Sequence, residues 1–218
     1  IKDSSIVHIV PDAAFALGDA DKMMERKYDT IGKYCNVAIS VRDWIHAPDN
    51  NTMPKYRKSI AAIVVKLVDL GYKVHFISTC QGIPYYADDN MIAHKIISLI
   101  PESYHSNIIT HDKYLSIPQI LKILRQMDFI IATRLHMSIL ALISGTPVYP
   151  IAYEFKTVEL YHSLGYETIY TLDSLSPADL CCSVKAFIDW LTPAKRLEIY
   201  TQVAKYIHGS TIAIQLIK

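Results

Sequence analysis

The segment Asp128-Phe129-Ile130-Ile131-Ala132-Thr133-Arg134-Leu135-His136, continued by an apolar run over 137–143 and by Gly145, carries the clearest structural signal in the chain. An isoleucine-rich run without polar interruptions is typical of a strand buried on both faces of a parallel sheet. Thr133 is a predicted helix N-cap, and helical apolar spacing continues to Gly145, a residue type that often ends helices. The segment therefore predicts a strand, a short turn and a helix.

Arg134 and His136 lie where this predicted helix begins. The first N–H groups of a helix have no partner within the helix, so they attract anions. Arg134 adds a permanent cation, and His136 adds a group that can exchange a proton near neutral pH. We therefore predict an anion site here. A histidine between apolar residues of a helix is also commonly a packing residue, and the sequence leaves that alternative open.

The rest of the chain alternates apolar strands with amphipathic helices. Further strands are predicted at 6–10, 36–41, 73–79, 107–110, 147–152 and 168–172, and helices at 54–70, 88–100, 117–127, 154–164, 175–191 and 193–207. Strands separated by helices of this length form right-handed βαβ units. The predicted fold class is therefore α/β, a Rossmann-like parallel sheet with helices on both faces.

Composition narrows the class of protein. The chain has 218 residues, of which 51% are hydrophobic and 20% charged, which suits a large folded domain and excludes a disordered chain. The net charge of +1 gives no reason to expect a nucleic-acid partner. No apolar run approaches the ~18 residues of a transmembrane helix. Because Ile1-Lys2-Asp3 resembles neither a signal peptide nor a translation start, we expect a piece of a longer protein.

The cysteines and histidines predict neither disulfides nor a metal site. The chain contains Cys35, Cys80, Cys181 and Cys182, and no two of them have CxxC spacing. Reduced thiols are therefore expected, which indicates a cytoplasmic protein. The histidines show no HxH or HExxH spacing, so no metal is predicted.

Loops that follow the predicted strands contain the other candidate ligand residues. Arg42 ends the strand at 36–41, Gln81 and Gly82 follow the strand at 73–79, and Lys156 follows the strand at 147–152. In parallel sheets, ligands bind beyond the carboxyl ends of the strands. Arg42 and Arg134 from separate loops would suit a small dianion or trianion, because each guanidinium can bind a phosphate or carboxylate bidentately.

Each of these residues also has an ordinary structural explanation. Arg42 could pair with Asp43, Lys156 could face solvent, and Asp88-Asp89 is better explained by capping of the helix that follows. The chain has no GxGxxG, no GxxxxGK[ST] and no GxSxG motif, and it has only 7 glycines. A small phosphorylated acid is therefore a better prediction than a nucleotide, and no cofactor is predicted.

At these residues the chain resembles the polysaccharide pyruvyl transferase family. The matching pieces keep the family's order and spacing, and they are residues 39–44, 76–82, 133–141, 145–148 and 153–156. The Arg134-Leu135-His136 element with its small-residue helix is the most specific of them. Residues 11–17 resemble the segment where the first half of that family passes into the second.

The resemblance implies the second, donor-binding domain of a two-domain GT-B fold. Residues 1–20 would then end the first domain or connect the domains, 21–191 would form the Rossmann-like domain, and 192–218 a C-terminal helix that packs back toward the first domain. The family transfers pyruvyl from phosphoenolpyruvate to a sugar of a surface polysaccharide, usually as a ketal. Arg42, Arg134, His136 and the backbone N–H of Leu135 would form the donor pocket.

The implied chemistry assigns His136 the role of general acid toward the methylene carbon of phosphoenolpyruvate, or else of phosphate ligand. The acceptor would be a sugar or a lipid-linked glycan, so a cytoplasmic enzyme could associate peripherally with a polysaccharide assembly complex at the inner face of the membrane. Two alternatives stay open. One is a nucleotide-sugar glycosyltransferase or epimerase of the GT-B kind, with Glu154 binding the ribose. The other is a non-catalytic domain that binds an anion or a partner.

Overall fold

The computed structural model describes residues 10–27, 29–43, 49–81, 88–167, 169–172 and 176–217. Its centre is a parallel sheet with the strand order β3-β2-β1-β4-β5-β6. The strands are β1 Asn36–Ser40, β2 Lys73–Phe76, β3 Ile108–Thr110, β4 Phe129–Ala132, β5 Val148–Ala152 and β6 Tyr170–Thr171. This order confirms the predicted Rossmann-like α/β sheet. The predicted strand at 6–10 lies outside the described residues, apart from Val10.

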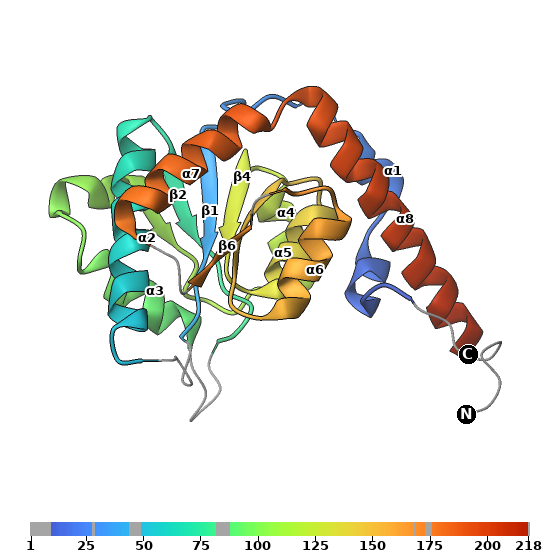
Figure 1. Ribbon diagram of the computed structural model, residues 1–218, viewed down its shortest axis with the longest axis horizontal. Coiled ribbons are helices and arrows are strands. Elements are labelled where there is room, and N and C mark those ends of the chain that lie inside the picture. Colours follow the sequence, from blue (N-terminus) through green and yellow to red (C-terminus); the bar gives the residue numbers. More distant parts are fainter. Residues whose placement is uncertain are drawn as a thin grey trace.

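Helices cover both faces of the sheet, as Figure 1 shows. On one side α2 packs against α3 and α7, and on the other α5 packs against α4. The bounds are α2 Thr52–Asp69, α3 Asp89–Ile97, α4 Ile117–Leu124, α5 Leu135–Ile143, α6 Phe155–Ser163, α7 Pro177–Trp190 and α8 Pro193–Ile217. Two further elements precede the sheet: the 3-10 helix η2 Ala13–Leu17 and the helix α1 Ala20–Met24.

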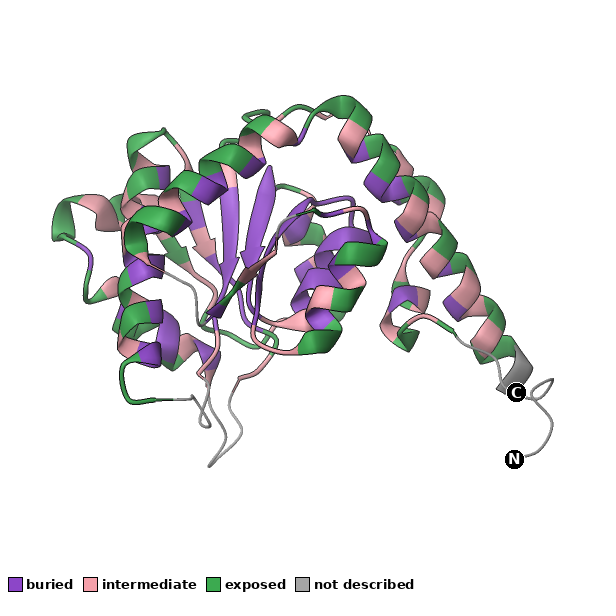
Figure 2. Cartoon of the chain, in the orientation of Figure 1, coloured by how far each residue is buried: buried purple, intermediate pink, exposed green. Residues whose placement is uncertain are grey.

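Burial explains why the central strands read as uninterrupted apolar runs. All residues of β4 and β5 are buried, and Figure 2 shows the centre of the sheet enclosed by helices. Helix α5 is buried from Met137 to Ile143, so it lacks the polar face of a surface helix. Gly145 ends it at φ +75°, in the left-handed region that favours glycine, and the Cβ of any other residue would meet the Met23 carbonyl oxygen at 2.9 Å.

The sheet reverses direction between β1 and β4. The chain moves outward from β1 to β2 and β3, and then returns to the other side of β1 to form β4, β5 and β6. Ser40 at the end of β1 is in register with Ala132 at the end of β4. In doubly wound sheets this topological switch point opens a crevice at the carboxyl ends of the strands. The loops after β1 and β4 therefore meet at the position where a ligand is expected.

The long helix α8 carries the described N-terminal segment away from the sheet. Both η2 and α1 contact α8, and η2 also contacts α5. The Phe15 ring packs edge-on against the Tyr206 ring, with 5.2 Å between the ring centres, and the Ser210 hydroxyl donates to the Asp12 carbonyl. Helix α8 continues ten residues past the predicted end at 207, and within this extension Ser210 is buried beside Asp12, which precedes η2. The division of the chain at residues 20 and 191 stays a prediction.

Candidate functional site

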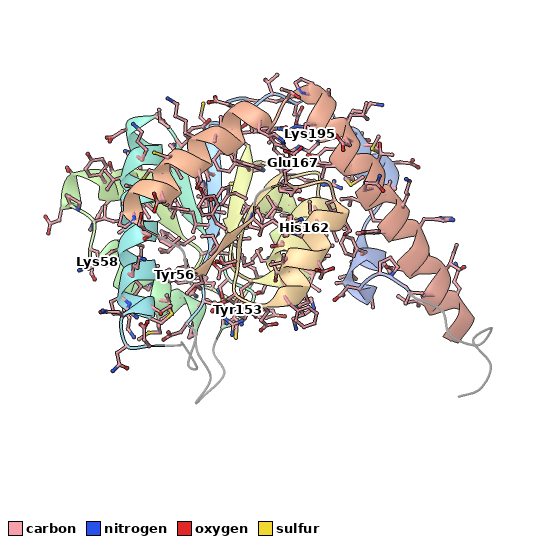
Figure 3. The ribbon with its side chains drawn as sticks, in the orientation of Figure 1. Tyr56, Lys58, Tyr153, His162, Glu167 and Lys195 are labelled. Carbon is pink, nitrogen blue, oxygen red and sulfur yellow. The ribbon has the colours of Figure 1, made fainter. Side chains whose placement is uncertain are left out.

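The turn after β4 is joined to β1 and to α2. The Thr133 N–H donates to the Ser40 carbonyl at 3.0 Å, which continues the β1–β4 ladder by one residue. The Thr133 hydroxyl lies 2.9 Å from the Tyr56 hydroxyl, and both side chains are buried. Burial raises the pKa of Tyr56, so its hydroxyl stays protonated. Figure 3 shows Tyr56 beside the carboxyl half of the sheet.

The prediction that Thr133 caps α5 is wrong. Arg134 is the N-cap residue of α5, and no side chain makes a capping hydrogen bond there. The hydroxyl of Thr133 binds Tyr56 instead, because the helix begins one residue later than its spacing indicated. Without a side-chain cap, the first N–H groups of α5, beginning with Leu135, depend on partners other than a cap.

Arg134 forms a bidentate ion pair with Asp89 at the start of α3. Its Nε donates to Asp89 Oδ2 at 2.9 Å and its Nη2 to Oδ1 at 2.6 Å. Only 1% of the Asp89 side chain is exposed, against 13% of the Arg134 side chain. Burial raises the pKa of Asp89, although Arg134 and the Ser78 hydroxyl oppose that rise. Asp88 is the N-cap of α3, as predicted, whereas Asp89 binds the arginine.

Arg42 follows β1 and stacks on an aromatic ring from the loop after β5. Its guanidinium carbon lies 4.0 Å from the centre of the Tyr153 ring, and its Nε donates to the Asp43 carbonyl at 3.3 Å. A cation over the face of an aromatic ring is attracted to it and is also held in orientation. Tyr153, visible in Figure 3, and Arg134 also interact electrostatically. Arg42 and Arg134 therefore belong to one cluster with Asp89 and Tyr153.

His136 points toward the N-terminal segment. Its side chain is 69% exposed, and its Nε2 lies 3.9 Å from Asp12 Oδ2, which is ion-pair distance when the imidazole is protonated. The other oxygen of Asp12 accepts from the Ala14 N–H and caps η2. Arg134 and His136 are therefore only two positions apart but have different neighbours. Arg134 is bound to α3, and His136 lies beside the segment that precedes the sheet. The role of His136 stays a prediction.

The remaining predicted site residues lie around the same edge of the sheet. Lys156 pairs with Glu154 at 3.0 Å and is largely exposed. Burial opposes the ionisation of Glu154, but hydrogen bonds from Lys156 and Tyr153 outweigh it and keep its pKa below the ordinary value. Gln81 donates to the His111 carbonyl at 3.0 Å, which joins the loops after β2 and β3. Gly82 lies outside the described residues.

The structure adds residues that the sequence did not single out. Asp89 and Tyr153 each contact one of the two predicted arginines across long sequence separations. The sequence predicted helix capping for Asp89 and placed Tyr153 only within the family-matching residues 153–156, and loops that follow strands were the shared sign of a role in a site. All four cysteines are free thiols. Among the described residues, no three metal-binding side chains form a cluster, and no helix has the length and apolarity to cross a membrane.

Solved structures with a similar fold are GT-B proteins of about twice this length. A structure of MnaA from S. aureus with UDP matches with a TM-score of 0.62 and 14% identity, over 100% of this chain and 55% of that one. A structure of the trehalose-6-phosphate synthase OtsA matches with a TM-score of 0.54 and 13% identity, over 97% of this chain and 49% of that one. The chain therefore has the fold of one half of a GT-B protein.

Sequence similarity is more specific than the fold. The chain is 28% identical over 185 residues to the amylovoran biosynthesis protein AmsJ of Erwinia amylovora, which covers 81% of this chain and 42% of AmsJ. It thus spans less than half the length of this curated relative. The family described as polysaccharide pyruvyl transferase matches residues 1–154, which include Arg42, Asp89, Arg134 and His136. The chain belongs to the polysaccharide pyruvyl transferase family.

Proposed function

We propose that this chain binds phosphoenolpyruvate and takes part in transferring its pyruvyl group to a sugar hydroxyl of a polysaccharide or of its lipid-linked precursor. The observation that carries the proposal is the placement of Arg42 and Arg134 on either side of the β1–β4 switch point. The enol carbon of phosphoenolpyruvate carries both a phosphate and a carboxylate. Two guanidinium groups and the first N–H groups of α5 supply donors for both.

The charge of the edge fits a small anion. Among the residues that the structure describes, no carboxylate lies within ion-pair distance of the Arg42 guanidinium, although Asp89 and Glu154 interact with it electrostatically. Arg134 is paired with Asp89 and contributes oriented donors rather than a full net charge. Gln81, Gly82 and Lys156 are proposed as supporting contacts to the donor. Because Arg134 is paired with a carboxylate and Arg42 is not, we place the phosphate of the donor nearer Arg42.

The proposed reaction conserves atoms and charge. A sugar hydroxyl oxygen forms a bond to the enol carbon, while protonated His136 gives its proton to the methylene carbon, which becomes a methyl group. The hydroxyl proton then returns to the imidazole. A second hydroxyl of the same sugar then forms a bond to that carbon while the bond from the carbon to the phosphate oxygen breaks. Its proton passes to the departing phosphate, so the products are the cyclic ketal and inorganic phosphate. General acid catalysis of this kind typically contributes ~100- to 10,000-fold in rate.

Ligand protection tests the donor. We expect phosphoenolpyruvate to raise the Tm of the chain, because a ligand that binds only the folded state stabilises it. Uridine and guanosine nucleotides should leave Tm unchanged, and inorganic phosphate should act only at higher concentration. Protection by a nucleotide but not by phosphoenolpyruvate would instead favour the nucleotide-sugar enzyme. Glu154, its candidate ribose ligand, already pairs with Lys156, which weakens that alternative.

Substitution of the histidine tests the chemistry. In the enzyme, His136→Asn should lower turnover at least ~100-fold while affinity for phosphoenolpyruvate changes little, because asparagine cannot transfer the proton. His208→Asn, on the exposed side of α8, is the matched control and should keep full activity. Turnover within about tenfold of wild type would remove His136 from the mechanism. Donor binding without phosphate release toward any glycan, in the wild type, would indicate a non-catalytic domain.

A further inference from the structure

Asp89 is placed to control the arginine of the proposed donor site. It starts α3, yet the helix cap is Asp88, whose side chain accepts from the Asn90 N–H at 2.8 Å. The Asp89 side chain instead turns inward and receives two hydrogen bonds from Arg134. The two residues are 45 positions apart in the chain, on loops that follow β2 and β4.

The carboxylate of Asp89 is itself held in place. The Asp89 N–H donates to the Cys80 carbonyl at 3.1 Å, and the Ser78 Oγ lies 3.3 Å from Asp89 Oδ2. That hydroxyl oxygen is also 2.8 Å from the Cys80 carbonyl and accepts from the Cys80 N–H. Ser78 and Cys80, which follow β2, therefore hold Asp89 through both its backbone and its carboxylate. Such a network leaves Asp89 little freedom to move when a ligand arrives.

Stability alone does not explain this arrangement. Replacing a buried ion pair by apolar residues of similar volume is often neutral or stabilising, because the charges lose their hydration. A bidentate pair does something that apolar packing cannot do, since it fixes the plane and rotation of a guanidinium. Asp89 is almost fully buried, whereas Arg134 keeps an exposed part at the carboxyl edge of the sheet. The Asp89 carboxylate thus binds Arg134 from the protein interior, and the exposed part of Arg134 faces the carboxyl edge of the sheet.

We propose that Asp89 is a positioning residue, which orients Arg134 for the anionic donor. The inference rests on the proposed function. Asp89 would not touch the donor; it would act through Arg134. Ser78 and the Cys80 carbonyl would support it in turn. Ser78, Cys80 and Asp89 would thereby influence donor affinity through Arg134, without contacting the donor themselves.

Two substitutions separate this role from a purely structural one. Asp89→Asn keeps the size of the side chain but removes the charge and one acceptor, and Asp89→Glu keeps the charge but displaces the guanidinium. Both should lower kcat/KM for phosphoenolpyruvate ~10- to 100-fold, mainly through KM, at a temperature where circular dichroism shows the variant folded. Asp189→Glu, on the exposed side of α7, is the matched control and should behave as wild type.

The other outcomes overturn the proposal. A lower Tm with unchanged KM in both variants would make the pair structural. A lower KM in Asp89→Asn would mean that Asp89 competes with the donor for Arg134. If Asp89→Asn fails to fold, Asp89→Glu decides alone, because it retains the ion pair.

A spectroscopic measurement separates this inference from the proposed function. The Arg134 Nε–H resonance should be sharp and protected from exchange in the wild type and should broaden in Asp89→Asn. It should shift in the wild type when phosphoenolpyruvate is added. A protected signal without any shift would contradict the proposed donor but leave the ordering of Arg134 intact. An unprotected signal in the wild type would contradict the role of Asp89 itself.

Discussion

Arg26 and Arg42 lie at opposite ends of the same sheet and have opposite surroundings. Arg26 precedes β1 and is 7% exposed. Its Nη1 donates to the Thr146 hydroxyl at 2.8 Å, its Nη2 to the Met127 carbonyl at 2.9 Å, and its Nε to Asp29 at 3.0 Å. The guanidinium of Arg42, at the carboxyl end, stacks on the Tyr153 ring and donates to the Asp43 carbonyl.

The difference shows how the same side chain becomes structural or available for a ligand. At the amino ends of β4 and β5 the protein itself satisfies the donors of Arg26, so this arginine joins loops together. At the carboxyl ends Tyr153 orients the guanidinium of Arg42, and no carboxylate among the described residues pairs with it directly. Arg134 is intermediate, with two donors bound to Asp89. In Figure 3, Tyr56 and Tyr153 mark the carboxyl half of the sheet, and Glu167 and Lys195 the opposite end.

The largest expected effect is at the amino end. Arg26→Ala should lower the free energy of unfolding by about 3–5 kcal/mol, because it leaves the buried partners of the guanidinium unpaired. Urea unfolding measures the loss, and the folded fraction should still bind phosphoenolpyruvate normally. Lys22→Ala, which breaks an exposed pair with Asp19, is the control and should leave the free energy of unfolding nearly unchanged. If Arg26→Ala abolished donor binding without lowering the free energy of unfolding, Arg26 would be a ligand-binding and not a structural arginine.

A second test asks whether polar groups of the carboxyl half are also structural. Burial, with smaller contributions from His111 and Lys73, lowers the pKa of His75 to about 4, and its Nδ1 lies 3.1 Å from His111 Nε2. The unfolded chain therefore binds more protons than the folded one between about pH 6.5 and 4. Stability is present above that window and should fall by about 2–3 kcal/mol as pH decreases through it.

Substitution isolates this histidine. His75→Gln should flatten most of the loss of Tm between pH 7 and pH 4.5, because glutamine does not titrate. The exposed His208→Gln should keep the wild-type pH dependence. An unchanged pH dependence in His75→Gln would show that other groups cause acid destabilisation, and His75 would then contribute no pH-dependent stability.

The smallest expected change in free energy is at Arg42. Arg42→Ala should weaken phosphoenolpyruvate binding by ~10- to 30-fold, about 1.5–2 kcal/mol, because one charge-assisted contact is lost. Its Tm should stay near that of wild type, since among the described residues no paired carboxylate would be left without a partner. Isothermal titration of the chain measures the affinity, with the exposed Lys122→Ala on α4 as control. A large drop in Tm with unchanged affinity would show that Arg42 has a structural role, as Arg26 does.

Local patterns predicted most of the architecture. The apolar runs at β1, β4 and β5 and the spacing in α2, α5 and α7 identify each element within a few residues, because burial on a fixed period leaves a direct mark on the sequence. Predictions were wrong where contacts between residues far apart in the sequence decide the local structure. Thr133 binds Tyr56 instead of capping α5, and α8 continues past residue 207, where Ser210 contacts the distant Asp12.

The amino-acid sequence on its own determined the parallel α/β sheet, the family and the edge at which Arg42, Arg134 and His136 lie. These follow from periodicity and motif order, which are properties of contiguous residues. Only the tertiary structure decided that Arg134 pairs with Asp89 and that Arg42 stacks on Tyr153. Those partners come from other loops, and no local pattern specifies which loop ends meet once the strands have ordered themselves side by side.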